Sequence, residues 1–297
     1  MATYSEQTYD AGSYQASRPR YKDSLVDTVL DYHRKDNPAA GTDLAVDVAT
    51  GTGIFARQLP SHFARVVATD LSATMLDSAR KAPGNASIEY VEAPAEDLSF
   101  LGAGSVDVMT VACAAHWFDV ERFVAEAGRV LKPSGTLAIF GYTGFGHFVD
   151  YPQCDRMLKD FGLSDDKLGA YWDKGRELLV NGYRAYHEVL VRKSWMGIQR
   201  HINADVIEKE PSSECPATVV PGSAILHFEV TWRTLRDFLL TWSCVHKFHS
   251  AHAEQENAAK VVIREMMAAA GATDVDEPLS IHWEEVMLVC HPPQAAD

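Results

Sequence analysis

The sequence predicts an α/β fold with a doubly wound, mostly parallel sheet and a helical cap insertion. Two observations carry this prediction. Between residues 44 and 140, short apolar runs alternate with segments of helical periodicity, as in a sheet covered by helices on both faces. The first apolar run, Leu44 to Val48, also leads into the glycine-rich turn Ala49-Thr50-Gly51-Thr52-Gly53. Runs that are apolar throughout are typical of parallel strands buried on both faces.

The first half of the chain supplies most of this pattern. Beyond the first run, strands are expected at 66–70, 88–93, 106–111 and 136–140. Helices are expected at 22–34, from about Phe55, at 73–81 and at 120–131, on the three- and four-residue spacing of their apolar side chains. Ser72 is placed to cap the helix at 73–81, because serine oxygens accept the free N–H groups of a first turn.

After Phe140 the alternation stops. Helices are expected at 151–161, 168–191, 231–246 and 254–270, the last ending at Gly271, and a closing strand at 281–290. A polar, proline-containing loop is expected around 204–222, and the segment 225–230 is left open between a core strand and part of the insertion. We therefore divide the chain into an arm (1–21), a cofactor-binding core (22–141), a helical cap (142–250) and a closing helix and strand of the core (251–297).

Composition excludes several classes of function. The chain has 297 residues and a net charge of −14, so it lacks the basic surface that binds nucleic acid. Its five cysteines are scattered and its histidines lack a completing ligand, so we expect reduced thiols and no metal. Neither a membrane-spanning run nor a signal peptide is evident. These features predict a cytoplasmic protein with a small-molecule substrate and leave its oligomeric state open.

The glycine turn and a later carboxylate together predict a cofactor that carries a nucleoside. Glycine lets the backbone approach a ligand closely, and Asp70 ends the next strand, where an α/β fold reaches the hydroxyls of a ribose. Ala56 at the third glycine position is still compatible with NAD. Asp47, however, would repel a pyrophosphate and would suit a cofactor with an amino group.

The pattern Asp-x-x-Thr-Gly-Thr-Gly resembles the first motif of class I S-adenosylmethionine-dependent methyltransferases. The resemblance continues through Pro94-Ala95-Glu96-Asp97-Leu98 and the segment 128–140, and covers about residues 9 to 141. It implies S-adenosylmethionine as cofactor, with Asp70 on the ribose, Glu96 on the adenine amino group and the backbone N–H of Asp97 on the ring. The cofactor-binding residues that it implies are Tyr14, Arg18, Asp47, Ala49, Gly51, Gly53, Asp70, Leu71, Met75, Ala95, Glu96, Asp97 and Ala112.

A second set of residues bears on the methyl acceptor. The string His116-Trp117-Phe118-Asp119, with Ala170-Tyr171-Trp172 and the aromatic segment 238–243, resembles the trans-aconitate methyltransferase-like enzymes of fungi, which methylate small carboxylic acids. From this resemblance and from the need for a cation near a carboxylate, the candidate substrate-binding residues are His116, Trp117, Trp172, Arg176, Arg233 and Trp242. Arg176, Arg233 and Arg236 are candidates to hold a carboxylate, because the planar guanidinium matches its geometry.

We expect methyl transfer to a carboxylate oxygen of a small organic acid, which is already ionised at pH 7 and needs no base. Several alternatives remain open. His116 is a possible base for O-, N- or S-methylation of a secondary metabolite, or it shapes the pocket wall only. The chain is alternatively a methyltransferase-like protein that uses its cofactor without methyl transfer, or, more distantly, an NAD dehydrogenase.

Overall fold

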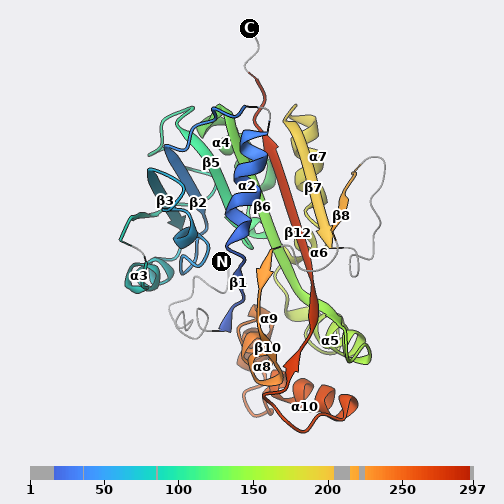
Figure 1. Ribbon diagram of the computed structural model, residues 1–297. Coiled ribbons are helices and arrows are strands. Elements are labelled where there is room, and N and C mark those ends of the chain that lie inside the picture. Colours follow the sequence, from blue (N-terminus) through green and yellow to red (C-terminus); the bar gives the residue numbers. More distant parts are fainter. Residues whose placement is uncertain (1–16, 36, 85, 204–214, 221–224, 295–297) are drawn as a thin grey trace.

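The computed structural model describes residues 17–35, 37–84, 86–203, 215–220 and 225–294. Its centre is an eight-stranded sheet in the order β4-β3-β2-β5-β6-β12-β7-β8 (Figure 1). Strand β12 is antiparallel to both of its neighbours, and the other pairs in this sheet are parallel. The fold is therefore the predicted α/β class with a mostly parallel sheet. The strands are β2 (Leu44–Val48), β3 (Arg65–Asp70), β4 (Ile88–Glu92), β5 (Val106–Ala112), β6 (Leu131–Phe148), β7 (Met196–Asn203), β8 (Thr218–Val220) and β12 (Ile281–His291).

Helices cover both faces of this sheet. On one face lies α2 (Ser24–Arg34), whose Leu25 and Val29 join one apolar cluster. On the other face lie α4 (Val120–Val130) and α7 (Arg184–Arg192), which contribute Phe123 and Tyr186 to a second cluster (Figure 1). The sheet is thus buried from both sides, which explains why its central strands are apolar throughout.

The predicted helices of the first half appear with small changes. Helix α3 (Ala73–Lys81) begins as expected at Ser72, whose side chain accepts the backbone N–H of Met75 at 3.3 Å. The helix expected from about Phe55 is only the short 3-10 helix η2 (Ala56–Gln58).

Four helices gather at the lower end of β6 and β12 in Figure 1: α5 (Gln153–Leu163), α8 (Trp232–Leu240), α9 (Ser243–Ala251) and α10 (Ala258–Ala270). Helix α10 packs against α5 and α8. It ends, as predicted, at Gly271, which takes a left-handed φ of 69°. The expected helix 231–246 is interrupted at Trp242, which separates α8 from α9.

The predicted cap, 142–250, is not one helical unit. Residues 141–148 remain in β6, because their apolar side chains are buried and the strand pairs with β12 as far as Phe148. Two further stretches of the same segment, β7 and β8, lie in the main sheet. Helices η4 (Gly169–Tyr171), α6 (Arg176–Val180) and α7 lie between β6 and β7 in the chain. Helix α10, assigned from sequence to the core, belongs instead with the lower helices.

The open segment 225–230 is not a strand of the main sheet. Its first part, β9 (Leu226–His227), pairs with β1 (Arg20–Tyr21) at the end of the predicted arm. Val230 and Thr231 form β10, which pairs with β11 (Pro278–Leu279). Among the described residues, no helix is long and apolar enough to cross a membrane.

Candidate active site

The turn after β2 has the backbone conformation that its glycines suggested. Ala49, Gly51 and Gly53 have φ values of 54°, 58° and 74°. A Cβ atom added to Gly51 would meet no atom within 4 Å, so the space above this residue is open to a ligand. At Gly53, the same atom would lie 3.0 Å from Tyr90 Oη, so a side chain there would force Tyr90 to shift in addition to the strain of a positive φ.

Asp47 lies beneath the turn rather than facing the open space. It is fully buried, and its two oxygens accept the hydroxyls of Thr50 at 2.6 Å and Thr110 at 2.7 Å. Burial raises the pKa of Asp47 to about 6, against the opposing effect of these two bonds. Asp47 therefore holds the turn through these two bonds, and its role in orienting a cofactor with an amino group stays a prediction.

Asp70 lies at the rim of the same space. Its Oδ2 accepts the N–H of Gly51 and its Oδ1 that of Ser72, each at 2.8 Å. Burial raises its pKa, and these backbone bonds oppose the rise. The next side chain, Leu71, is 63% exposed although it is apolar. A fixed carboxylate beside an exposed apolar side chain and an open glycine turn fits a ribose and an adenine ring, so this edge fits S-adenosylmethionine.

The segment expected to meet the adenine is only partly as predicted. Glu96 is half-buried and accepts the N–H of Asp119 at 2.9 Å, so its carboxylate is held at this edge. Asp97 is exposed, but its backbone N–H is donated to the carbonyl of Pro94 at 3.3 Å. The expected N–H contact from Asp97 to a ring is therefore not available in this conformation. The remaining apolar residues assigned to the cofactor are in the core (Met75, Ala95) or half-buried at the end of β5 (Ala112), and Tyr14 lies outside the described residues.

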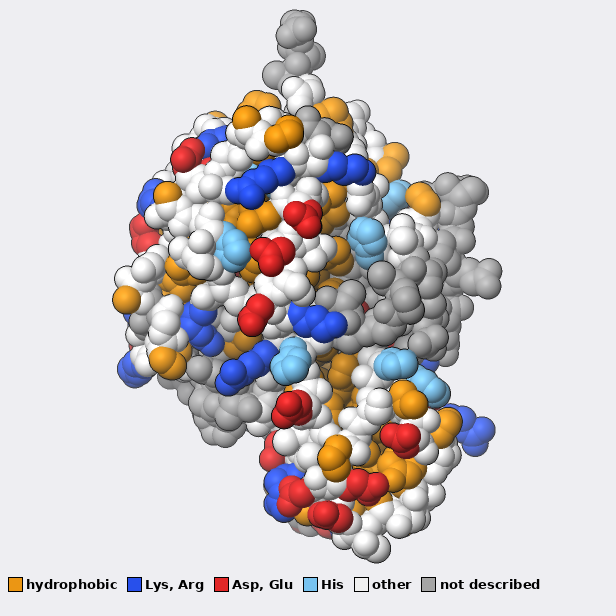
Figure 2. Space-filling model, viewed as in Figure 1, with side chains coloured by type: hydrophobic (Ala, Val, Ile, Leu, Met, Phe, Trp, Pro, Cys, Tyr) orange, Lys and Arg blue, Asp and Glu red, His pale blue; other side chains and the backbone are white. Residues whose placement is uncertain are grey.

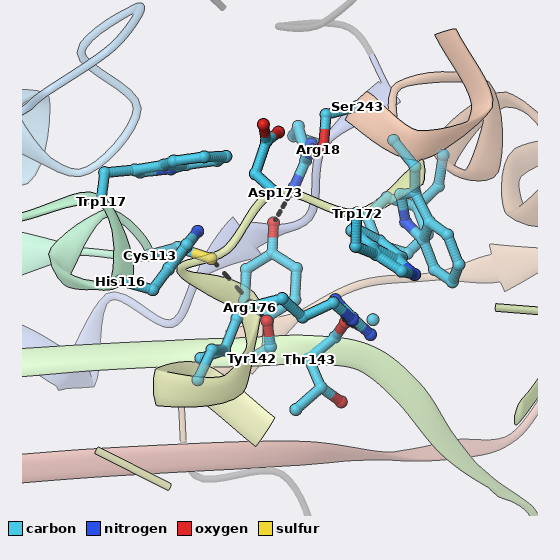
Figure 3. A pocket seen from close by; sticks show the side chains of 14 residues that line it. Arg18, Cys113, His116, Trp117, Tyr142, Thr143, Trp172, Asp173, Arg176 and Ser243 are labelled. Carbon is cyan, nitrogen blue, oxygen red and sulfur yellow. Dashed lines mark hydrogen bonds between the residues drawn. The ribbon is translucent and has the colours of Figure 1, made fainter. Parts of the chain in front are cut away.

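A pocket lies beyond the end of β5, between β6, α6, α8 and α9 (Figure 3). Five of the six residues assigned to the substrate line it, and Arg18, assigned to the cofactor, lines it too. The lining residues are Arg18, Cys113, His116, Trp117, Tyr142, Thr143, Gly144, Trp172, Asp173, Arg176, Leu179, Phe238, Trp242 and Ser243.

Arg176 is held flat between aromatic rings. Its Cζ lies 3.6 Å from the centroid of the Trp172 ring and 4.8 Å from that of Phe145. Both terminal nitrogens donate to the carbonyl of Thr143 at 3.4 Å. The guanidinium is thus fixed in orientation at the pocket wall, with the charge of the cation stabilised by the ring faces.

Arg18 reaches the pocket from the arm. Its Nη1 donates to Tyr142 Oη and its Nη2 to the carbonyl of Thr241, both at 3.3 Å, and its Cζ lies 5.4 Å from the ring centroid of Phe238. The contact with Tyr142 is drawn in Figure 3. Two arginines therefore line one pocket, offset by Asp173, which pairs with Lys247.

Two of the arginine candidates are not in the pocket. Arg233 is 47% exposed and binds both carboxylate oxygens of Asp276, at 2.7 and 2.9 Å. Arg236 pairs with its neighbour Asp237. Helix α8 buries Trp232, Leu235, Phe238 and Leu239, and positions 233 and 236 lie outside that stripe. The structure therefore does not bring Arg233 to this pocket, although its sequence position made it a substrate candidate.

His116 lines the pocket in its neutral form. Its Nδ1 lies 3.5 Å from Tyr183 Oη, a long contact. Burial lowers the pKa of His116 to about 3, with Arg176 and Arg18 adding to the effect. A group that binds a proton so weakly is a poor general base at pH 7.

Two tryptophans, Trp172 and Trp242, both line the pocket and pack against the apolar core. Trp172 and Trp242 line the pocket, and their rings also pack together with centroids 5.3 Å apart. Trp242 occupies the position that a Cβ atom of Gly144 would need, 2.8 Å away, and Gly144 has a φ of 88°. Sequence reasoning missed the contribution of β6, namely Tyr142, Thr143 and Gly144. The one signal for it was the unusual glycine and aromatic content of 141–148.

Within the described ranges, no group of three histidine, cysteine, aspartate or glutamate side chains could hold a metal ion. The surface drawn in Figure 2 carries acidic and basic side chains interspersed, without a continuous basic face.

Known proteins resemble this chain in both sequence and fold. A family model described as a methyltransferase domain matches residues 46–139. The chain is 26% identical to the "Probable S-adenosylmethionine-dependent methyltransferase CRG1" of Saccharomyces cerevisiae, over 97% of each chain. It is 36% identical to methyltransferase pgmE of Aspergillus terreus over 53% of this chain, and so spans about half (49%) of that relative. The structure of "a Putative Type II Methyltransferase from Anaeromyxobacter dehalogenans" matches with a TM-score of 0.64 and 25% identity, over 93% of this chain and 99% of the other.

The glycine turn, the carboxylate at the end of β3 and these similarities agree with one another. The protein is an S-adenosylmethionine-dependent methyltransferase with the fold typical of class I enzymes, and S-adenosylmethionine is its methyl donor.

Proposed function

We propose that this enzyme transfers a methyl group to a carboxylate oxygen of a small organic acid. The observation that carries the proposal is the pair Arg18 and Arg176, which line the same aromatic pocket directly beyond β5. In a chain with a net charge of −14, two arginines in one pocket favour an anionic ligand. The resemblance of the segment 116–119 to trans-aconitate methyltransferase-like enzymes points to the same substrate class.

The cofactor edge is assigned in the same proposal. Asp70 accepts the ribose hydroxyls, Glu96 accepts the adenine amino group, and Leu71 packs against the ring. Asp70 already receives two backbone N–H groups, which fix its orientation without occupying every lone pair of a carboxylate.

Methyl transfer to a carboxylate depends on the alignment of donor and acceptor more than on acid–base catalysis. S-adenosylmethionine supplies an activated methyl group on its sulfonium. Arg176, and Arg18 from the opposite side, would orient the acid, since a positioned nucleophile about 3–3.5 Å from the reacting carbon accounts for much of such a rate enhancement. The pocket tryptophans exclude water, and neutral His116 shapes the wall near the end of β5.

A direct test is to incubate the enzyme with methyl-labelled S-adenosylmethionine and separate panels of small acids, phenols, amines and thiols. We expect label on the acids, including trans-aconitate, in a product that mild alkali hydrolyses as an ester. Label on phenols, amines or thiols alone would contradict the proposal.

The alternative with His116 as a base makes a different prediction. If the acceptor is a carboxylate, His116→Gln should lower kcat by less than about tenfold, because no proton is removed; loss of a general base typically costs about 100- to 10,000-fold. A loss in that higher range, with cofactor binding retained, would favour a phenol, amine or thiol acceptor.

A further inference from the structure

Two consecutive glutamates of β12 are buried beside the pocket, although the reaction as proposed uses neither. Glu284 is 5% exposed and Glu285 is 3% exposed. Burying a carboxylate is costly unless it is hydrogen-bonded, so each must have a compensating set of contacts. Because successive side chains of a strand point to opposite faces, the two carboxylates reach different partners.

Glu284 lies opposite an irregularity in β6. Trp283 pairs with Gly146 and Glu285 with Tyr142, so three residues of β6, 143–145, stand opposite Glu284 alone. Such a bulge redirects side chains and carbonyls out of the regular ladder. The left-handed Gly144 lies in its middle.

The contacts of Glu284 lead to Arg176. Its Oε2 accepts the hydroxyl of Thr143 at 2.6 Å, and its Oε1 lies 3.3 Å from Lys159 Nζ. The same threonine hydroxyl accepts the N–H of Phe145 at 3.1 Å, which closes the bulge. The carbonyl of Thr143 then receives both terminal nitrogens of Arg176, which lies over Thr143 in Figure 3.

The contacts of Glu285 lead to Arg18. Its Oε2 accepts the N–H of Ile225 at 2.9 Å and its Oε1 that of Leu226 at 3.0 Å. Leu226 belongs to β9, which pairs with β1, and the carbonyl of Ile225 accepts the N–H of Lys22 at 2.8 Å. Arg18 lies two residues before β1, which runs beside β9 in Figure 1.

We propose that Glu284 and Glu285 are positioning residues for the methyl acceptor: Glu284 fixes Arg176 through Thr143, and Glu285 fixes the strand pair that carries Arg18. Two consecutive residues of β12 thus position both cations of the pocket, Glu284 through the bulge and Glu285 through β9. This inference rests on the proposed function, because it takes the two arginines as the groups that bind the acid.

The test compares Glu284→Gln and Glu285→Gln with the control Glu229→Gln. Glutamine keeps the size of glutamate but replaces one acceptor oxygen by an NH₂ group. In both networks this new donor would face another hydrogen-bond donor. Glu229 is exposed and lies two residues beyond β9, so its replacement removes the same charge without touching either network. The acceptor is the acid that the labelling panel identifies.

Each buried variant should raise the KM for the acid about tenfold, since a charge-assisted contact is misplaced, and should change kcat and the Kd for S-adenosylhomocysteine by less than about threefold. The Glu229 variant should change none of these. A higher Kd in Glu285→Gln with an unchanged KM would overturn the proposal for Arg18 and assign this arginine to the cofactor.

A double-mutant cycle separates positioning from a general loss of structure. Arg176→Met removes the guanidinium but keeps apolar contact with Trp172. In that background, Glu284→Gln should raise KM no further, whereas Glu285→Gln should still raise it about tenfold, because it acts on a different arginine. An equal effect of Glu284→Gln in both backgrounds would contradict its action through Arg176.

Amide hydrogen exchange tests the positioning without any acceptor. Glu285→Gln should speed exchange at Ile225 or Leu226 about tenfold or more, and Glu284→Gln should do so at Phe145, because each amide depends on the carboxylate or on the hydroxyl that it holds. Unchanged exchange would overturn the inference even if acids are methylated. Faster exchange with no acid methylated would overturn the proposed function and still support the positioning of the arm and the bulge.

Discussion

The proposed cofactor edge and the proposed acceptor pocket are built in different ways. At the cofactor edge, the contacts are mostly local or result from strand pairing: Asp47 with Thr50, and Asp70 with Gly51 and Ser72. In the pocket, side chains arrive from the arm, the segment that follows β5, β6, α6, α8 and α9. Backbone geometry therefore defines the cofactor edge, whereas long-range side-chain packing defines the pocket.

The largest effect is expected at the cofactor edge. Asp70→Ala removes the acceptor of two backbone N–H groups and the proposed ribose contacts, each worth about 1.5–3 kcal/mol when charged. We expect the Kd for S-adenosylmethionine, measured by calorimetry, to rise about 100-fold or more. The matched control is Asp77→Ala, since Asp77 is exposed on α3 and pairs only locally with Arg80. An unchanged Kd in Asp70→Ala would refute the ribose assignment.

The next largest effect should be confined to the pocket. Arg176→Met should raise the KM for the acid about 10- to 100-fold, because a charged hydrogen-bond donor is lost while the packing over Trp172 is kept. The Kd for the cofactor should change by less than about threefold, since Arg176 lies beyond the end of β5 rather than at the turn. If cofactor binding falls as much as acid binding, the two regions are not separable and the comparison fails.

Asp47, beneath the glycine turn, should make the stability of the protein depend on pH. Its pKa is raised from 3.8 to about 6, so the native state binds the proton more tightly than the unfolded chain does. The stability that this preference contributes is complete below pH 3.8 and is lost as the pH rises through about 6, a loss on the order of 3 kcal/mol.

Asp47→Asn removes this titration. Urea unfolding at several pH values should therefore give a flatter profile for the variant than for the wild type between about pH 4 and 7. Parallel profiles for the two proteins would show that Asp47 titrates as it does in the unfolded chain.

The smallest effect is expected at Arg233. Its pair with Asp276 is exposed and screened by solvent, so Arg233→Met should leave the free energy of unfolding nearly unchanged and should change the KM for the acid by less than about twofold. Steady-state kinetics of Arg233→Met and Arg176→Met, measured in parallel with the same acid, provides the comparison. A tenfold rise in KM would place Arg233 in the acid site after all.

Features that depend on neighbouring residues could be predicted from the sequence. The strands from Leu44 to Phe140, the cap at Ser72, the end of α10 at Gly271 and the turn at Gly51 are all of this kind, and the structure confirms them. The tertiary features could not be read in this way. That β7 joins the sheet, and that β9 pairs with β1, depends on contacts between distant segments.

The arginines show the same limit within the site. Three arginines looked equivalent in sequence as carboxylate ligands. Only the packing of α8 reveals that Arg233 and Arg236 lie outside its buried stripe, while Arg176 lies against Trp172 in the pocket. The residue type indicated that an arginine could bind a carboxylate, but the buried face of each helix determines which arginine reaches the pocket.

Strand β6 has a consequence for how the two ligands bind. Its Phe140 carbonyl accepts the N–H of Cys113 at the end of β5, and only two residues later the same strand lines the pocket. The two proposed sites adjoin at this point, because Ala112 is assigned to the cofactor and the next residue, Cys113, lines the pocket. This junction offers a route for thermodynamic linkage. If the bound acid tightens the donor by some factor, the donor must tighten the acid by the same factor. An inhibitor that fills only the pocket would then titrate differently before and after the donor is added, and the ratio of its two affinities would measure that linkage directly.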